Sequence, residues 1–133
     1  MENQNTLCND CSYIIEILKK IDKMQKEAII SEEQECITCQ NSLISFANNT
    51  IPLIIGLRCG GTLSGNVGTT GQTAYHFKVE SIRCNRYITL RLLTLDDSTL
   101  SATPYTLTID GECICYIQCL EPISTTPCNL TSL

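Results

Sequence analysis

Ten of the 133 residues are cysteines, and thiols at this density could bind a metal, carry redox chemistry or form disulfides. The opening residues, MENQNTLCND, lack the charged and then apolar pattern of a secretion signal, so we expect synthesis in a reducing cytosol. Disulfides would then require later exposure to an oxidising environment. The candidate cross-linking residues are Cys8, Cys11, Cys36, Cys39, Cys59, Cys84, Cys113, Cys115, Cys119 and Cys128.

Two C-x-x-C pairs, Cys8 with Cys11 and Cys36 with Cys39, form the strongest metal-binding pattern in the chain. Four thiolates in two such pairs suit tetrahedral zinc. The segment between the pairs has a helical pattern, however, and a continuous helix of about 30 Å would place the pairs at its opposite ends. A small zinc-binding module is therefore the alternative function, and the main interpretation includes no cofactor. A thioredoxin-like role for the first pair is weaker, because no strand can precede it.

Three further cysteines lie in the segment CICYIQC, residues 113–119, which has the character of a β-strand. Strand alternation would place Cys113, Cys115 and Cys119 on one face, together with Ile117. Neighbours at i and i+2 on a strand have Cα atoms about 6.6 Å apart and nearly parallel Cα–Cβ bonds, which is poor disulfide geometry. Their partners should lie on another strand, in the tail or on another molecule, unless the thiols are simply buried as small apolar groups.

Residues suited to catalysis are few, and we expect no enzymatic activity. His76, the only histidine, falls on the polar side of its expected strand, and Asp96 and Asp97 fall in an expected turn. The glycine-rich segment 56–72 lacks the lysine of a P-loop and the spacing of a dinucleotide-binding loop, so we interpret it as a flexible loop. A cysteine paired with His76 as a nucleophile stays open, because such partners meet in space rather than in sequence.

The composition argues against two classes of partner. The formal net charge is -5 and the pI is near 4.7, which disfavours nucleic-acid binding through clustered lysines and arginines. The longest apolar run, residues 51–57, is far shorter than the roughly 20 residues of a membrane helix. Only 17% of the residues are charged, so the surface must be rich in serine, threonine and asparagine, which favours self-association.

The elements that must position the cysteines follow from the apolar pattern. Residues 9–30 predict an amphipathic helix that packs against the core or a neighbouring copy. Its expected apolar face consists of Ile14, Ile17, Leu18, Ile21, Met24 and Ala28. After Cys39, short segments rich in β-branched and aromatic residues predict strands. The predicted strands are residues 43–46, 51–58, 74–82, 87–95, 105–110 and 112–120.

These elements predict an α+β fold that is mainly β, an N-terminal amphipathic helix followed by an antiparallel β-sandwich of jelly-roll type. We expect a single domain over residues 1–133. Residues 1–40 hold the helix and the C-x-x-C pairs, residues 41–121 the sandwich, and residues 122–133 a tail. The expected inward side chains are Tyr75, Phe77, Val79, Ile88, Leu90, Leu92, Tyr105, Leu107 and Ile109.

Several segments resemble a known family. FKVES (77–81), TLRLLT (89–94) and above all TLTIDGECICYIQCL (106–120) are similar to segments of the cysteine-rich spore coat and exosporium proteins of spore-forming bacilli, the CotY, CotZ and ExsY family. CSYIIEILKKIDKMQ (11–25) and TIPLIIGL (50–57) are similar to that family's opening helix and following strand. The resemblance covers most of the chain in the same order. The chain departs from the family in a shorter connection between residues 95 and 105 and in its glycine-rich centre.

The resemblance implies a structural protein that self-assembles into a two-dimensional, hexagonal lattice in the spore coat or exosporium and is locked by disulfides. Such a lattice would form a protective, semi-permeable barrier. The implied partners are other copies of the chain, in a hexamer-based homo-oligomer, and other coat or exosporium proteins, with no nucleic acid and no membrane. Synthesis in the mother-cell cytoplasm, followed by oxidation as the coat matures, would reconcile the many thiols with the absence of a signal peptide.

Overall fold

The described part of the protein consists of one long helix and a mainly antiparallel β-structure. The computed structural model describes residues 12–35, 49–69 and 71–125. The elements are α2 (Ser12–Glu35), β1 (Leu53–Leu57), β2 (Gly65–Val67), β3 (Gln72–Ala74), β4 (His76–Arg83), β5 (Tyr87–Asp96), β6 (Thr99–Asp110), the 3-10 helix η2 (Gly111–Cys113) and β7 (Ile114–Cys119).

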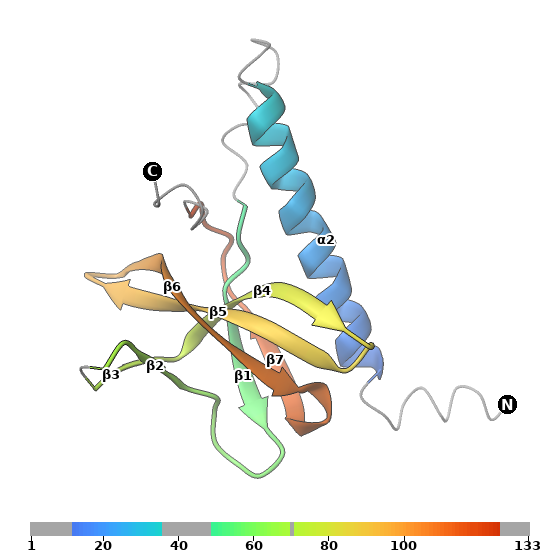
Figure 1. Cartoon of the computed structure of the whole chain (residues 1–133), viewed down its shortest axis with the longest axis vertical. Coiled ribbons are helices and arrows are strands. Elements are labelled where there is room, and N and C mark those ends of the chain that lie inside the picture. The colour runs from blue at the N-terminus through green and yellow to red at the C-terminus, as the bar shows by residue number, and fades with distance from the viewer. Residues whose placement is uncertain (1–11, 36–48, 70, 126–133) are drawn as a thin grey trace, which may run out of the picture.

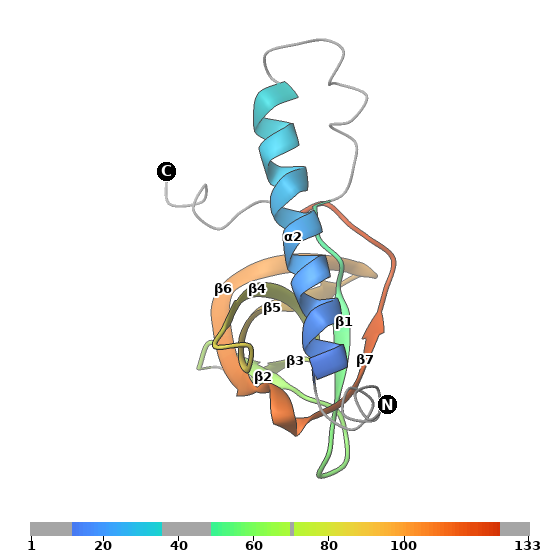
Figure 2. The same ribbon diagram turned by 90° about the vertical axis from the view of Figure 1, so that its right-hand side faces the viewer.

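Five strands form one antiparallel sheet in the order β6-β5-β4-β1-β7. The sheet is strongly curled, and α2 lies against it with its C-terminal half extending past the strands (Figures 1 and 2). Strands β2 and β3 form a separate hairpin that packs on β5 and β6. The hairpin comes so close that a Cβ atom on Gly65 would lie 2.8 Å from Leu92 and 2.9 Å from Leu107. The predicted combination of one helix near the N-terminus and a mainly antiparallel β-structure is confirmed for the described residues.

The core lies between α2 and the sheet and is built almost entirely from aliphatic side chains. The predicted inward residues of β4 and β5 are buried, together with Ile114 at the start of β7. Tyr75 is exposed instead, because it lies in the link between β3 and β4 rather than within a strand. Tyr105 is also exposed, which corrects the prediction that it faces inward. The buried core cluster is Ile15, Leu18, Ile21, Leu53, Ile55, Ala74, Phe77, Val79, Ile88, Leu90, Leu92 and Ile114.

Two connections differ from the sequence-based expectation. The segment 56–72, predicted as a flexible loop, contains β2 and the first residue of β3. Strand β6 begins well before residue 105, because Asp97 and Ser98 adopt positive φ angles of 53° and 70° in a tight turn that pairs Asp96 with Thr99. The placement of Asp96 and Asp97 at a turn between strands is therefore confirmed. The predicted strand 43–46 lies outside the described residues.

Helix α2 buries a face that the sequence pattern located only in part. Leu18 and Ile21 are buried as expected, but Ile15 and Gln25 are buried with them, while Met24 is 51% exposed. These positions follow from a helix that lies against β4 along the line through residues 15, 18, 21 and 25. Met24 is on the flank of that line. The expected position of Met24 in the packed face was wrong.

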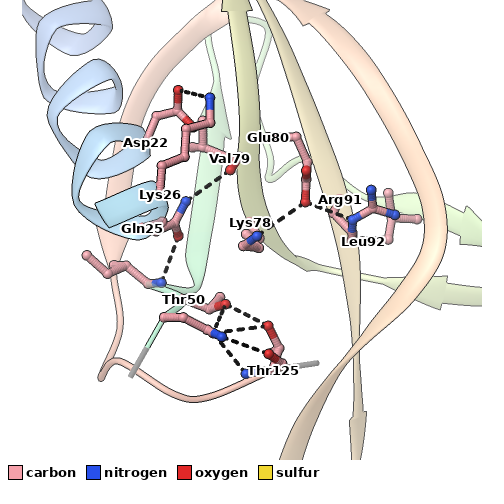
Figure 3. A network of polar contacts seen from close by, with 12 residues as sticks. Asp22, Gln25, Lys26, Thr50, Lys78, Val79, Glu80, Arg91, Leu92 and Thr125 are labelled. Carbon is pink, nitrogen blue, oxygen red and sulfur yellow. Dashed lines mark hydrogen bonds and ion pairs between the residues drawn. The ribbon is translucent and has the colours of Figure 1, made fainter. Parts of the chain in front are cut away.

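Gln25 fills a gap in the sheet between β1 and β4. These strands pair only at Leu53 and Phe77, and the next antiparallel pair in this register would join Ile51 to Val79. The Gln25 carboxamide takes the place of that pair (Figure 3). Its Oε1 accepts a hydrogen bond from the Ile51 N–H at 2.9 Å, and its Nε2 donates one to the Val79 carbonyl at 3.0 Å. The helix therefore completes the hydrogen bonding of two diverging strands.

A second carboxamide extends the ladder on the other side of β1. Beyond the strand itself, Thr50 exchanges backbone hydrogen bonds with Ile123 at 3.0 and 2.8 Å. Asn49 then continues the pairing with its side chain: its Nδ2 donates to the Thr125 carbonyl and its Oδ1 accepts from the Thr125 N–H. The chain after β7 is thus held beside the chain before β1.

We predict that Gln25→Ala lowers the free energy of unfolding by about 2–3 kcal/mol, since it leaves a backbone donor and a backbone acceptor without their partner. Urea unfolding of the reduced protein, followed by circular dichroism, measures this loss. Met24→Ala, one position along the same helix, is the matched control because the Met24 side chain is half exposed. Equal losses for the two variants would contradict the bridging role of Gln25.

Candidate cross-linking surface

The five cysteines that the structure describes all lie at the surface. They form no disulfides with one another, and each is exposed. The alternative that Cys113, Cys115 and Cys119 are buried as small apolar groups was therefore wrong. They come from four different places in the fold, namely the turn after β1, the β4–β5 turn, η2 and β7. The described cysteines are Cys59, Cys84, Cys113, Cys115 and Cys119. Cys8, Cys11, Cys36, Cys39 and Cys128 lie outside the described residues, and with them the proposed zinc ligands.

Cys84 occupies an unusual position at the tip of the β4–β5 hairpin. Cys84 and Asn85 have φ angles of 56° and 53°, and the Arg86 N–H bonds to the Arg83 carbonyl at 2.9 Å. Two central residues with positive φ define a type I′ turn, in which glycine and asparagine are favoured. Asn85 fits that preference, whereas a cysteine at the first position costs conformational energy. The turn projects the exposed thiol away from the sheet despite this cost.

Cys59 and Cys113 lie at one end of the molecule, where the chain leaves β1 and approaches β7. The Arg58 N–H bonds to the Cys113 carbonyl at 2.9 Å, and the Arg58 Nε donates to the Glu112 carbonyl at 2.8 Å. Cys59 follows directly, in a turn that Gly60 and Gly61 complete with positive φ angles. This backbone contact brings the two cysteine-bearing connections together, although they are far apart in sequence.

An ion pair fixes the β4–β5 turn to the same end of the molecule. The Arg86 guanidinium donates two hydrogen bonds to the Asp110 carboxylate, at 2.9 and 2.7 Å, and the Glu112 carboxylate lies 3.5 Å away. The hydrogen bonds from Arg86, together with one from the Glu112 N–H, lower the pKa of Asp110 below its ordinary value. The same pairing raises the pKa of Arg86. Cys84 and Cys113 are thus carried by two connections that this ion pair links.

The predicted one-faced row of cysteines along CICYIQC is interrupted twice. Cys113 belongs to η2, and the strand begins only at Ile114. The register with β1 then shifts: Leu57 pairs with Ile114 and Gly56 with Tyr116, which leaves Cys115 without a paired residue. Such a bulge disturbs the alternation of side chains. Cys119 lies within the regular part of β7, opposite the buried Leu53, and therefore on the core side of the sheet.

The packing of β1 against β7 at this point requires a glycine at position 56. A Cβ atom there would overlap the ring of Tyr116, which lies directly over the Gly56 backbone. Tyr116 is nevertheless 48% exposed, and every other tyrosine of the chain is exposed as well. The five residues are Tyr13, Tyr75, Tyr87, Tyr105 and Tyr116. Aromatic rings with a polar end are common in protein interfaces, so each of these exposed rings is suited to a contact with another molecule.

Other candidate groups form no site among the described residues. No three histidine, cysteine, aspartate or glutamate side chains come together there in a way that could hold a metal ion. His76 is half-buried in β4 and alternates with the buried Phe77, as expected for the polar side of its strand. No helix in the described ranges combines the length and the apolar character needed to cross a membrane.

Comparisons with known proteins identify no relative. A scan of protein-family models, a search of curated proteins and a search of solved structures each gave no match to the chain.

We predict that Cys84→Gly raises the free energy of unfolding by roughly 1 kcal/mol, because glycine adopts a positive φ without the steric cost of a side chain. Urea unfolding under reducing conditions measures the change. Cys59→Gly is the control, since Cys59 does not have a positive φ and its replacement only adds flexibility to the unfolded chain. A clear loss of stability for Cys84→Gly would contradict the strained geometry of this turn.

The ion pair between Arg86 and Asp110 makes the stability of the fold depend on pH. The pKa of Asp110 is lower in the folded state than in the unfolded chain. At pH values above the unfolded pKa, the ion pair therefore contributes its full stabilisation to the fold. This stabilisation disappears as the pH falls through the lowered folded value. We predict that Arg86→Met moves the Asp110 pKa back toward its ordinary value and weakens the acid dependence of stability. Carboxyl NMR titration measures the pKa, and Arg83→Met, which removes the same charge from the same hairpin, should leave it unchanged.

Proposed function

We propose that this chain is a structural protein of the outer layers of bacterial spores, which self-assembles into a cysteine-cross-linked two-dimensional lattice. The observation that carries the proposal is the exposure of every described cysteine. Thiols on separate surface connections are available to other copies of the chain. The lattice would act as a protective, semi-permeable barrier in the coat or exosporium.

The sequence resemblance supports the same proposal. Its most specific segment, residues 106–120, forms the end of β6, η2 and β7, and it carries three of the exposed thiols. Within the proposal, the curled sheet and the β2–β3 hairpin are parts of a jelly-roll-like sandwich. The protomer is made in the mother-cell cytoplasm with reduced thiols and is oxidised after assembly.

A lattice needs at least two kinds of contact between protomers, one that closes a ring and one that joins rings. The exposed cysteines suit this requirement because they are distributed over several connections rather than gathered in one site. Each non-covalent contact is weak, but a protomer held at several contacts and by covalent bridges does not leave when one contact opens. Hexagonal packing is the arrangement that the resemblance favours.

The cross-linking chemistry needs an oxidant, which we take to be a low-molecular-weight disulfide such as oxidised glutathione. A protein thiolate attacks that disulfide, and the first small thiol leaves. A thiolate of a neighbouring copy attacks the mixed disulfide, and the second small thiol leaves. Two protein thiols thus lose two electrons and two protons, and one small disulfide becomes two thiols.

We predict that purified protein exposed to oxidised glutathione forms high-mass species on non-reducing gels, and that these collapse to the monomer with dithiothreitol. Electron microscopy of the oxidised sample should show sheets with a regular repeat. The control is the variant with all ten cysteines replaced by serine, which should form no covalent species. A monomer band alone for the wild-type chain, with and without reductant, would overturn the proposal.

The zinc-binding alternative is tested on the same sample. It requires one zinc ion per chain in tag-free protein, lost in the Cys36→Ser/Cys39→Ser variant. Elemental analysis measures the zinc content. Stoichiometric zinc together with an absence of covalent species would favour the alternative over the lattice.

A further inference from the structure

Strand β7 is an edge of the sheet, and it lacks two of the features that usually keep an edge from pairing, namely charged residues and proline. Among the described residues, β1 is the only strand beside it (Figure 2). Its sequence, ICYIQC, contains neither a charged residue nor a proline. The opposite edge, β6, differs in both respects, since it contains Pro104 and Asp110 and is packed by the β2–β3 hairpin. Uncharged, proline-free edges are those that pair with further strands.

Successive residues of β7 direct their backbone N–H and C=O groups alternately toward β1 and toward the open edge of the sheet. The Leu120 N–H bonds to the Pro52 carbonyl, so even-numbered residues of this stretch direct their polar groups toward β1. The other side of β1 agrees with this assignment, because Ile51 and Ile55 make their hydrogen bonds away from β7. Residues Ile117 and Cys119 therefore direct their N–H and C=O groups to the free side. These groups form a template for one more strand.

We propose that β7 pairs antiparallel with β7 of a second copy about a two-fold axis that places Cys119 opposite Cys119 of the second copy. The inference rests on the proposed self-assembly and gives it a specific contact. An axis at Cys119 joins the outward N–H and C=O groups of the two residues. Their Cα atoms would then be about 5.5 Å apart, within the range of a disulfide. Both thiols would lie on the same face of the joined sheets.

The two neighbouring axes are less suitable for a bridge. An axis at Gln118 would place the Cys119 residues on a diagonal, with Cα atoms about 7–8 Å apart, which is too far for a disulfide. An axis at Ile117 would place Cys119 opposite Cys115, the residue that the register shift leaves without a partner. Regular pairing cannot extend through that bulge. Cys119 is the position where regular strand geometry and an exposed thiol coincide.

A two-fold contact of this kind is closed, because each β7 edge is used up by the other. It would join rings rather than build them, and it leaves the thiols at the other end of the molecule for a different contact. The bridge forms by the exchange with oxidised glutathione described above, one bridge per pair of protomers. The product is a covalent dimer that extends the sheet across two copies.

The test uses the full chain with Cys119 as its sole cysteine and the other nine replaced by serine. With oxidised glutathione we expect a covalent dimer that forms at least about ten-fold faster than in the matched chain that keeps only Cys84. Circular dichroism confirms that both chains fold. Equal rates for the two chains, or no dimer from the Cys119 chain, would overturn the inference.

Backbone variants test the strand pairing itself. Ile117→Pro removes an N–H that faces the free side and should slow dimer formation of the Cys119 chain about ten-fold. Amide hydrogen exchange, which needs no further substitution, gives a second measure. In the reduced monomer the Gln118 amide should be protected and the Cys119 amide unprotected, and dimer formation should protect Cys119. An unprotected Cys119 amide in the dimer would show that the thiols meet without pairing of the strands.

The proposed function and this contact can fail separately. Wild-type protein that forms reducible sheets while the Cys119 chain stays monomeric would leave the lattice standing and remove the β7 contact. Wild-type protein that stays monomeric in oxidant, beside a Cys119 chain that forms a dimer, would support the contact and overturn the lattice.

Discussion

The structure depends on the way in which the short strand β1 joins β4 on one side to β7 on the other. On one side it pairs with β4 at a single position, and the Gln25 carboxamide then joins the diverging backbones. On the other side it pairs with β7, and the Asn49 side chain continues that ladder to Thr125. Buried backbone groups need partners, and here two side-chain amides supply them where the strands cannot. The helix, the sheet and the segment after β7 are therefore connected through one short strand.

The described cysteines lie outside the core that this arrangement holds together. The described core is aliphatic, with Phe77 as its only aromatic residue and without a cysteine. Cysteines that contribute nothing to the core lie instead in turns and at the edge strand, where packing does not restrict their chemistry. Cys84 adopts a backbone conformation that favours glycine or asparagine. Within the described residues, the core therefore needs no sulfur chemistry, and the thiols are accessible at the surface.

The spacing of apolar residues located most helices and strands, but it did not reveal which contacts join them. The strands of the buried sheet were predictable because Phe77, Val79, Ile88 and Leu90 alternate with polar residues. Gln25 lies among the apolar positions of its helix, and this polar residue was the available signal for a buried bridge. Its partners are 26 and 54 residues away, so a local pattern could not identify them. The interruption of the cysteine row was equally hidden, since it arises from pairing with Gly56 and its neighbours.

The exposure of all five tyrosines has a practical consequence for spectroscopy. The chain contains no tryptophan, so tyrosine supplies its intrinsic near-ultraviolet absorbance and fluorescence. In most globular proteins these signals change when the core forms, because some of the rings become buried. Here the rings of the folded protomer remain in contact with solvent. Intrinsic emission should therefore change little when the chain folds, and a larger change would report the burial of these rings against another molecule.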